Sequence, residues 1–138
     1  MIYTFVITVP AKTSLDAPLT QRITVKGEIL TQVSLLIPPG HMALAGLQIY
    51  YGDKQLIPAN EGSWLMGDGE SISWPEYIEL PEPETTLIVK AYNDDEVYSH
   101  TFYLRIITTY RKYMMPSETM SRVYKLFEWL LSRLRGRV

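Results

Sequence analysis

Two histidines are the side chains of this sequence best suited to acid–base chemistry. His41 follows a Pro-Pro-Gly turn, which predicts a solvated side chain, and His100 lies among aromatic residues, which favours a packed structural role. Neither belongs to an HExxH motif or stands beside a candidate nucleophile. The segment Gly67–Ser71 does not match GxSxG, a motif that also needs a strand, a turn and a helix around it. The sequence therefore predicts neither a zinc hydrolase site nor a serine hydrolase site.

Two groups of carboxylates are the next candidates. Asp94, Asp95 and Glu96 are adjacent and could offer oxygen ligands to Ca²⁺, but such a site needs about six oxygens and the DxDxDG spacing is missing. A solvated turn is the favoured interpretation. The second group lies among prolines and suggests a charged sheet edge that discourages aggregation. Its members are Glu76, Glu79, Glu82 and Glu84. With no cysteine in the chain, we expect a protein that is not an enzyme and has no cofactor and no metal.

Aromatic residues are a stronger signal than any catalytic motif. The chain has 10 Tyr, 3 Trp and 3 Phe. If Trp64, Trp74 and Tyr77 were exposed together, they would form a stacking platform for a carbohydrate. Buried, the same side chains belong to the core, and Tyr and Trp are also common in protein–protein interfaces. All three interpretations remain open at the level of sequence.

Short extended segments position these side chains over most of the chain. Alternating apolar residues, bounded by Gly, Pro, Asn and Asp, predict strands about every ten residues. The expected strands are Ile2–Val9, Leu19–Lys26, Glu28–Ile37, Leu44–Tyr51, Lys54–Ile57, Glu70–Trp74, Thr85–Tyr92 and Val97–Thr109, with a loop over Pro58–Gly69. Pro75 is expected to end its strand. The sequence predicts a mainly β fold, an antiparallel Ig-like or jelly-roll-like sandwich of about eight strands, over residues 1–110.

Only the last segment, residues 114–138, has a helical period. Apolar residues recur there at intervals of three and four, which places them on one stripe of an amphipathic helix. The stripe and its flank, expected to form an interface, are Met120, Val123, Tyr124, Phe127, Leu130, Leu131 and Leu134. Leu126 and Trp129 widen the apolar surface, and Gly136 is a stop signal. Residues 111–138 are thus predicted to be a linker and a helical arm.

Charge is divided between the two predicted parts. Residues 1–110 contain six Lys/Arg and thirteen Asp/Glu, whereas residues 111–138 contain seven Lys/Arg and two Asp/Glu. A basic helix joined to an acidic body either folds back on that body or docks on a neighbouring copy. An acidic body repels phosphate, so no nucleic acid partner is expected.

No targeting segment is expected. Residues 1–10 lack the basic region and small-residue cleavage site of a signal peptide. No run of about 18 uncharged apolar residues is present, so we expect no transmembrane helix.

Four short segments carry a resemblance to a known group of proteins. They are Ile37–Gly40, Ile49–Asp53, Trp64–Asp68 and Tyr92–Asp95. With them, residues 1–110 resemble the small β-sandwich structural proteins of tailed bacteriophages and related archaeal viruses, such as capsid decoration and head–tail accessory proteins. The resemblance implies a non-enzymatic virion component that forms a homo-oligomer or binds other structural proteins through its helix; otherwise a cytoplasmic location is expected. Two alternatives are a carbohydrate-binding module and a peripheral membrane protein anchored by the helix.

Overall fold

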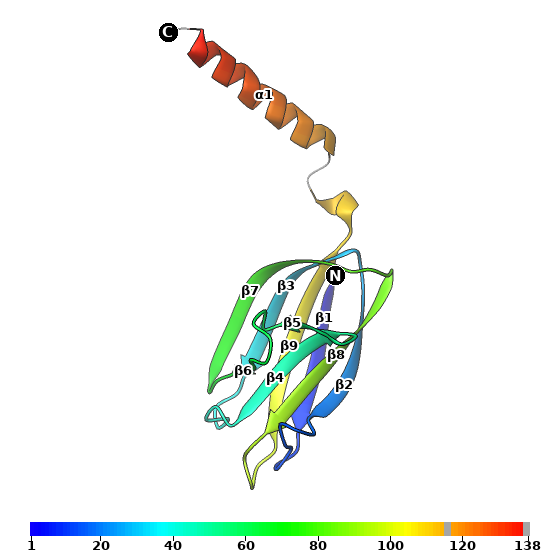
Figure 1. Cartoon of the computed structure of the whole chain (residues 1–138), viewed down its shortest axis with the longest axis vertical. Helices are drawn as coiled ribbons and strands as arrows, with labels where there is room; N and C mark the ends of the chain where they lie inside the picture. The colour runs from blue at the N-terminus through cyan, green and yellow to red at the C-terminus, as the bar shows by residue number, and fades with distance from the viewer. Residues whose placement is uncertain (115–116, 137–138) are drawn as a thin grey trace.

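The computed structural model describes residues 1–114 and 117–136, and it omits the side chains of residues 117–120. This part of the chain forms a two-sheet body with an α-helix beyond one end of it (Figure 1). The strands are β1 (Ile2–Val9), β2 (Leu19–Lys26), β3 (Ile29–Ile37), β4 (Ala45–Tyr51), β5 (Lys54–Ile57), β6 (Leu65–Met66), β7 (Glu70–Glu79), β8 (Glu84–Asn93) and β9 (His100–Thr109). A 3₁₀ helix, Arg111–Tyr113, and helix α1, Ser117–Arg135, follow.

Strand pairing is antiparallel and nested. One sheet has the order β1-β9-β3-β7, and the other has the order β2-β8-β4-β5, with β6 paired to β4. Strand β1 pairs with β9, β2 with β8, β3 with β7 and β4 with β5, as if one long hairpin had been rolled up. This order is that of a jelly roll. The predicted antiparallel sandwich is therefore confirmed, and the pairing selects the jelly roll over the Ig-like arrangement.

The core lies between the two sheets and follows the alternation of the strands. In β3, Val33, Leu35 and Ile37 point inward and are fully buried, as the period of two in the sequence predicts. On β9, Phe102, Leu104 and Ile106 do the same. The opposite sheet supplies the facing layer, which includes Ile23, Val25, Leu47, Ile49, Leu87 and Val89. Burial of these apolar side chains from water is the main force that holds the two sheets together.

Strand β7 corrects one expectation of the sequence. Pro75 does not end the strand, which runs without interruption from Glu70 to Glu79. Because β7 is an edge strand, half of its backbone N–H groups face no partner, and a missing donor there costs little. The register with β3 also shifts between Leu30 and Gln32, and Gln32 is the residue that faces Pro75.

The predicted loop over Pro58–Gly69 contains a short strand that the sequence did not indicate. Strand β6 pairs with β4 through Gly46 and Leu47. The ring of Tyr92 lies so close to Gly46 that a Cβ atom there would clash with it. Trp64 packs edge-on against the same ring, with centroids 4.8 Å apart. This loop therefore covers part of the outer face of the second sheet.

The layered core makes a prediction about stability. Replacing Leu104 with Ala leaves a cavity between the sheets and should lower the free energy of unfolding by about 2–5 kcal/mol. Leu36→Ala is the matched control, because Leu36 lies on the outer face of β3 and is exposed; it should cost less than about 1 kcal/mol. Urea unfolding followed by tryptophan fluorescence measures both. Equal losses would contradict the assignment of the two faces.

Candidate functional site

Helix α1 presents a broad apolar surface to solvent. Seven side chains, which we call the apolar arc, share one side of it: Val123, Tyr124, Leu126, Phe127, Leu130, Leu131 and Leu134. At about 100° per residue they span about 160° of the helix circumference. Phe127 is 60% exposed and Leu130 is 47% exposed, and the rest of the arc is exposed except Leu131, which is half-buried. Met120, also predicted for this surface, lies outside the described side chains.

The opposite side of the helix is basic. Lys125 lies opposite the apolar arc, and Arg122 and Arg133 lie along one of its borders. Arg133 stacks over the ring of Trp129 with 4.7 Å between the guanidinium carbon and the ring centroid. Arg133 and Arg135 fall in the last turn, where positive charge interacts favourably with the helix dipole. The helix ends before Gly136, as predicted, with the N–H of Gly136 donating to the carbonyl of Ser132 at 3.0 Å.

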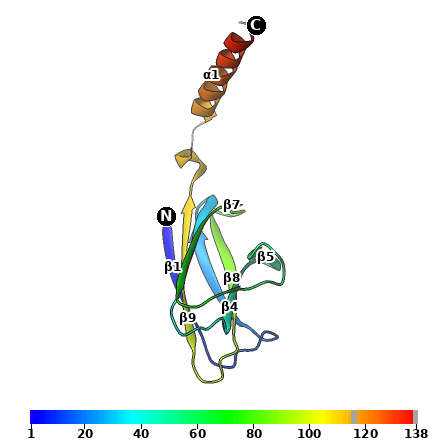
Figure 2. The same cartoon turned by 90° about the vertical axis from the view of Figure 1, so that its left-hand side faces the viewer.

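The junction between body and helix is fixed to the sandwich at its start. The backbone N–H of Arg111 donates to Glu28 Oε1 at 3.1 Å, and its guanidinium donates to Glu79 Oε1 at 3.1 Å. From there the chain leads away from the sheets, and α1 lies clear of the sandwich in two perpendicular views (Figures 1 and 2). The sequence did not indicate these two carboxylate partners, because Glu28 precedes β3 and Glu79 ends β7, far away in the chain.

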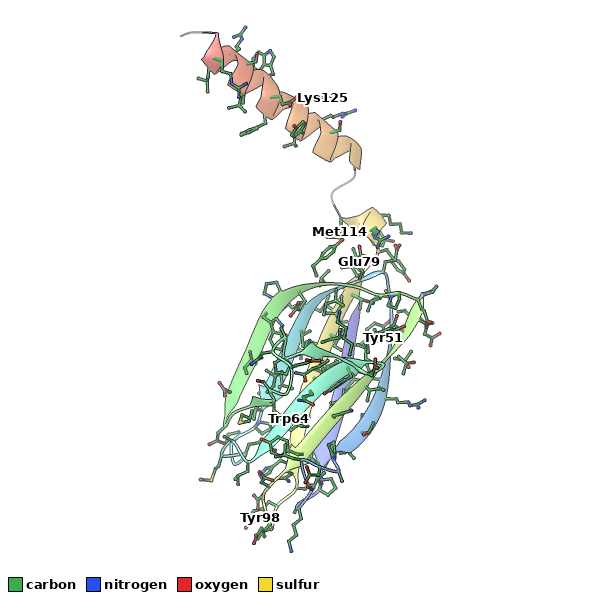
Figure 3. The ribbon with its side chains drawn as sticks, viewed as in Figure 1. Tyr51, Trp64, Glu79, Tyr98, Met114 and Lys125 are labelled. Atoms are coloured by element: carbon green, nitrogen blue, oxygen red, sulfur yellow. The ribbon has the colours of Figure 1, made fainter. Side chains whose placement is uncertain are left out.

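The structure does not bring the three predicted stacking residues together. Trp64 lies in the loop that covers the second sheet (Figure 3). Trp74 is half-buried on the inner side of β7, where its Nε1 donates to Glu76 Oε1 at 2.8 Å. Tyr77 is 60% exposed and lies three residues further along β7, hence on the opposite face. These side chains form no common platform for a sugar ring.

The prediction that His41 is solvated is wrong. His41 is only 1% exposed, because the turn after Pro38 folds it against β9. Its Nε2 lies 3.0 Å from the carbonyl oxygen of Thr101, and its ring packs edge-on against Phe102 and 4.5 Å from the ring of His100. Its Nδ1 is buried without a hydrogen-bond partner. Burial, and secondarily the nearby His100, lower the pKa of His41 below its ordinary value of 6.5.

The hairpin carboxylates are more ordered than a solvated turn. Asp95 Oδ1 accepts hydrogen bonds from the backbone N–H groups of Val97 and Tyr98, and its Oδ2 lies 2.9 Å from Nε2 of His100. These contacts, those from the two N–H groups first, lower the pKa of Asp95. They also fold residues 97–99 out of the strand, so that β9 begins at His100 and not at Val97 as predicted. His100 itself is buried, as expected.

A second aspartate holds the turn that contains His41. Asp68 Oδ1 accepts a hydrogen bond from the N–H of Gly40 at 2.8 Å. Backbone N–H groups of Met42 and Gly40 lower the pKa of Asp68. Met42 and Ala43 both have positive φ angles, 48° and 58°, which non-glycine residues seldom adopt. The polar groups at this end of the sandwich therefore fix loop conformations.

Metal ligands and membrane-spanning helices are the two remaining features to consider. Among the described side chains, those of residues 1–114 and 121–136, no three His, Asp or Glu are grouped so that they could hold a metal ion. In the same part of the chain, no helix has the length and apolar character needed to cross a membrane.

Comparison with known proteins gave structural neighbours only. No protein-family model and no curated protein matches the chain. Similar solved structures include the decameric BFDV capsid protein (10% identity, 76% of this chain and 91% of that chain, TM-score 0.43). Others are infectious bursal disease virus, Gt strain (13%, 78% and 32%, TM-score 0.40), and a family two carbohydrate esterase from Cellvibrio japonicus (14%, 78% and 34%, TM-score 0.36). Viral capsid proteins are thus among the neighbours, at low identity, and an enzyme is as well.

Burial of His41 predicts a pH dependence of stability. Because its pKa is lower in the folded state, the unfolded chain binds the proton more readily, and stability should fall as the pH drops below about 6.5. In His41→Gln, whose amide can still donate to Thr101, the loss in this window should be smaller. Urea midpoints between pH 7.5 and 5.5 measure the difference. The loss due to Asp68 and Asp95 belongs to a separate window below about pH 4. Identical pH profiles for both proteins would contradict the assignment.

Proposed function

We propose that this protein is a non-enzymatic assembly subunit whose C-terminal helix binds another subunit. The observation that carries the proposal is the exposed apolar arc of α1. Burying one such side chain contributes roughly 1.5–3 kcal/mol, so seven of them favour contact with a partner strongly. A helix that is apolar over nearly half of its circumference is typical of helices with a protein or lipid partner, because a solvated helix needs no such surface.

A homo-oligomer is the simplest assembly that satisfies this surface. Each copy supplies a basic helix and an acidic body, so attraction between unlike charges acts between copies as well as within one. We further propose that the assembly is a virion structure, of the capsid or tail accessory type that the sequence resembles. The jelly roll recurs in viral capsid domains but also in lectins and cupins. The helix, and not the fold, therefore carries the proposal.

A change in the apolar arc should release monomers. Phe127→Ser combined with Leu130→Asp places a carboxylate and a hydroxyl at the centre of the arc, where burial would cost several kcal/mol. We expect the wild type to sediment as an oligomer at micromolar concentration and the double variant as a monomer. Its sandwich should stay folded, since no strand contacts these two residues, and circular dichroism checks this.

The control has the same kinds of change on the other side of the helix. Lys125→Ser with Ser132→Asp alters the basic face, about 180° from the arc, and should leave the oligomer intact. A wild type that sediments as a monomer at high micromolar concentration, with a helix resistant to proteases, would contradict the proposal. That result would favour a helix folded back on its own body.

A membrane surface is a second candidate partner, and the same helix favours it. Amphipathic helices with Lys and Arg on the polar side bind anionic bilayers by burying their apolar side at the interface. Flotation with liposomes of phosphatidylcholine and phosphatidylserine distinguishes the two candidates. Recovery of the protein with the liposomes, combined with a monomeric state in their absence, would favour the membrane.

A further inference from the structure

One lateral side of the sandwich is open. Strands β5 and β7 are the outermost strands of their sheets on this side. Two hollows of about 310 and 620 Å³ lie between them, and both are bordered by Ala59 and Glu76. The two hollows adjoin at these residues, and together we call them the β5–β7 groove. Its apolar lining includes Leu56, Leu65, Ile72, Trp74 and Ile78.

The groove exists because the two edge strands differ in length. Strand β7 has 10 residues and β5 has 4, so much of β7 has no strand facing it. Its inward side chains Ile72, Trp74 and Ile78 are only half-buried. The inward residues of β9 in the same sheet are completely buried. The groove is thus a section of the core that this copy of the chain leaves uncovered.

Two carboxylates border the groove, in a body that is acidic as a whole. Residues 1–110 contain thirteen Asp/Glu and six Lys/Arg. Glu76 and Glu79 border the groove directly, and Lys54 is the single basic residue among the described lining residues. A partner with an apolar centre and basic flanks therefore matches both the lining and the charge.

Helix α1 has these properties and a suitable size. Its 19 residues extend over about 28 Å, and the 10 residues of β7 extend over about 33 Å. With the apolar arc turned toward the groove, Arg122 and Arg133 lie together along one border of the arc. The helix and the groove are thus similar in length and apolar character, and the helix carries the opposite net charge to the body.

The chain's own helix does not cover the groove. Arg111 is bonded to Glu28 and Glu79 at the end of the sandwich, and the chain leaves the body there. Helix α1 begins at Ser117 and extends away from β5 and β7, as Figure 2 shows. A helix that fills the groove would therefore come from a second copy.

The geometry points to a specific contact: α1 of one copy docks into the β5–β7 groove of a neighbouring copy. The inference rests on the proposed assembly function and adds the surface that receives the helix. It differs from a helix–helix association, in which α1 would pack on α1 and the groove would stay empty.

Ala59→Arg tests the contact. Ala59 is exposed and borders both parts of the groove. An arginine there occupies the β5–β7 groove and repels the basic helix, and it leaves the core undisturbed. We expect the dissociation constant of the oligomer, measured by sedimentation equilibrium, to rise about 30-fold or more. Thr20→Arg adds the same side chain to the exposed face of β2, in the other edge strand of that sheet, and should have no effect. Glu76→Arg, on the inward side of β7 and on the border of both hollows, is a second groove variant in case Ala59→Arg does not fold.

Mixing two defective variants gives a sharper result. The Phe127→Ser, Leu130→Asp variant keeps an intact groove, and Ala59→Arg keeps an intact helix. Each alone should be monomeric, while an equimolar mixture should form heterodimers through one helix and one groove. Neither a helix–helix association nor a helix folded back on its own body restores binding in this way.

The outcomes separate the inference from the proposed function. If the wild type is oligomeric and both groove variants assemble with unchanged affinity, the groove is not the receptor, and the assembly function stands. If the groove variants fail to assemble but the mixture stays monomeric, docking between copies is excluded. If the wild type is monomeric, both the proposed function and the inference fail.

Discussion

Nested antiparallel pairing is the constraint on which the rest of this structure depends. Strand β1 finds its partner in β9, more than 90 residues later, and the pairs β2–β8 and β3–β7 lie inside this outer pair. Once these ladders form, the inner face of each sheet is determined, and alternate residues of every strand face the core. The innermost pair, β4–β5, is closed by a two-residue turn at Gly52, whose φ is +60°. Because β5 is so short, the sandwich closes well where β1 meets β2 and poorly where β5 meets β7.

The acidic body and basic helix are best understood together with this incomplete closure. The apolar side chains between the sheets are buried within one copy. Those of the apolar arc of α1 and of the β5–β7 groove remain exposed or half-buried. The proposed assembly would use these two exposed apolar surfaces, which lie at different places on one chain. The polar groups around His41 and Asp95 lie at the end of the sandwich away from α1. Their hydrogen bonds fix the conformation of loops.

The sequence predicted what local periodicity controls and missed what depends on the strand order. Alternation in Ile29–Ile37 and the three-four spacing after Val123 identified the buried faces and the helix. Pro75 was misjudged because edge strands tolerate proline, and no local signal shows which strand is an edge. His41 was misjudged because its burial comes from contact with Phe102, which is distant in the chain. The separation of Trp74 and Tyr77 was foreseeable, since residues three apart on a strand face opposite sides.

The division of the groove walls between two sheets has a consequence for the timing of the proposed assembly. A roll whose first and last strands pair has a high contact order, and such topologies fold slowly, whereas a helix forms in about a microsecond. Although β5 and β7 are close in the chain, the groove between them exists only after β5 has paired with β4 and β7 with β3. In the proposed assembly, the helix is therefore available early in the life of each molecule, but the groove that would receive it exists only on molecules that have completed the roll. Such an assembly would include chains that have completed folding and exclude chains that have not.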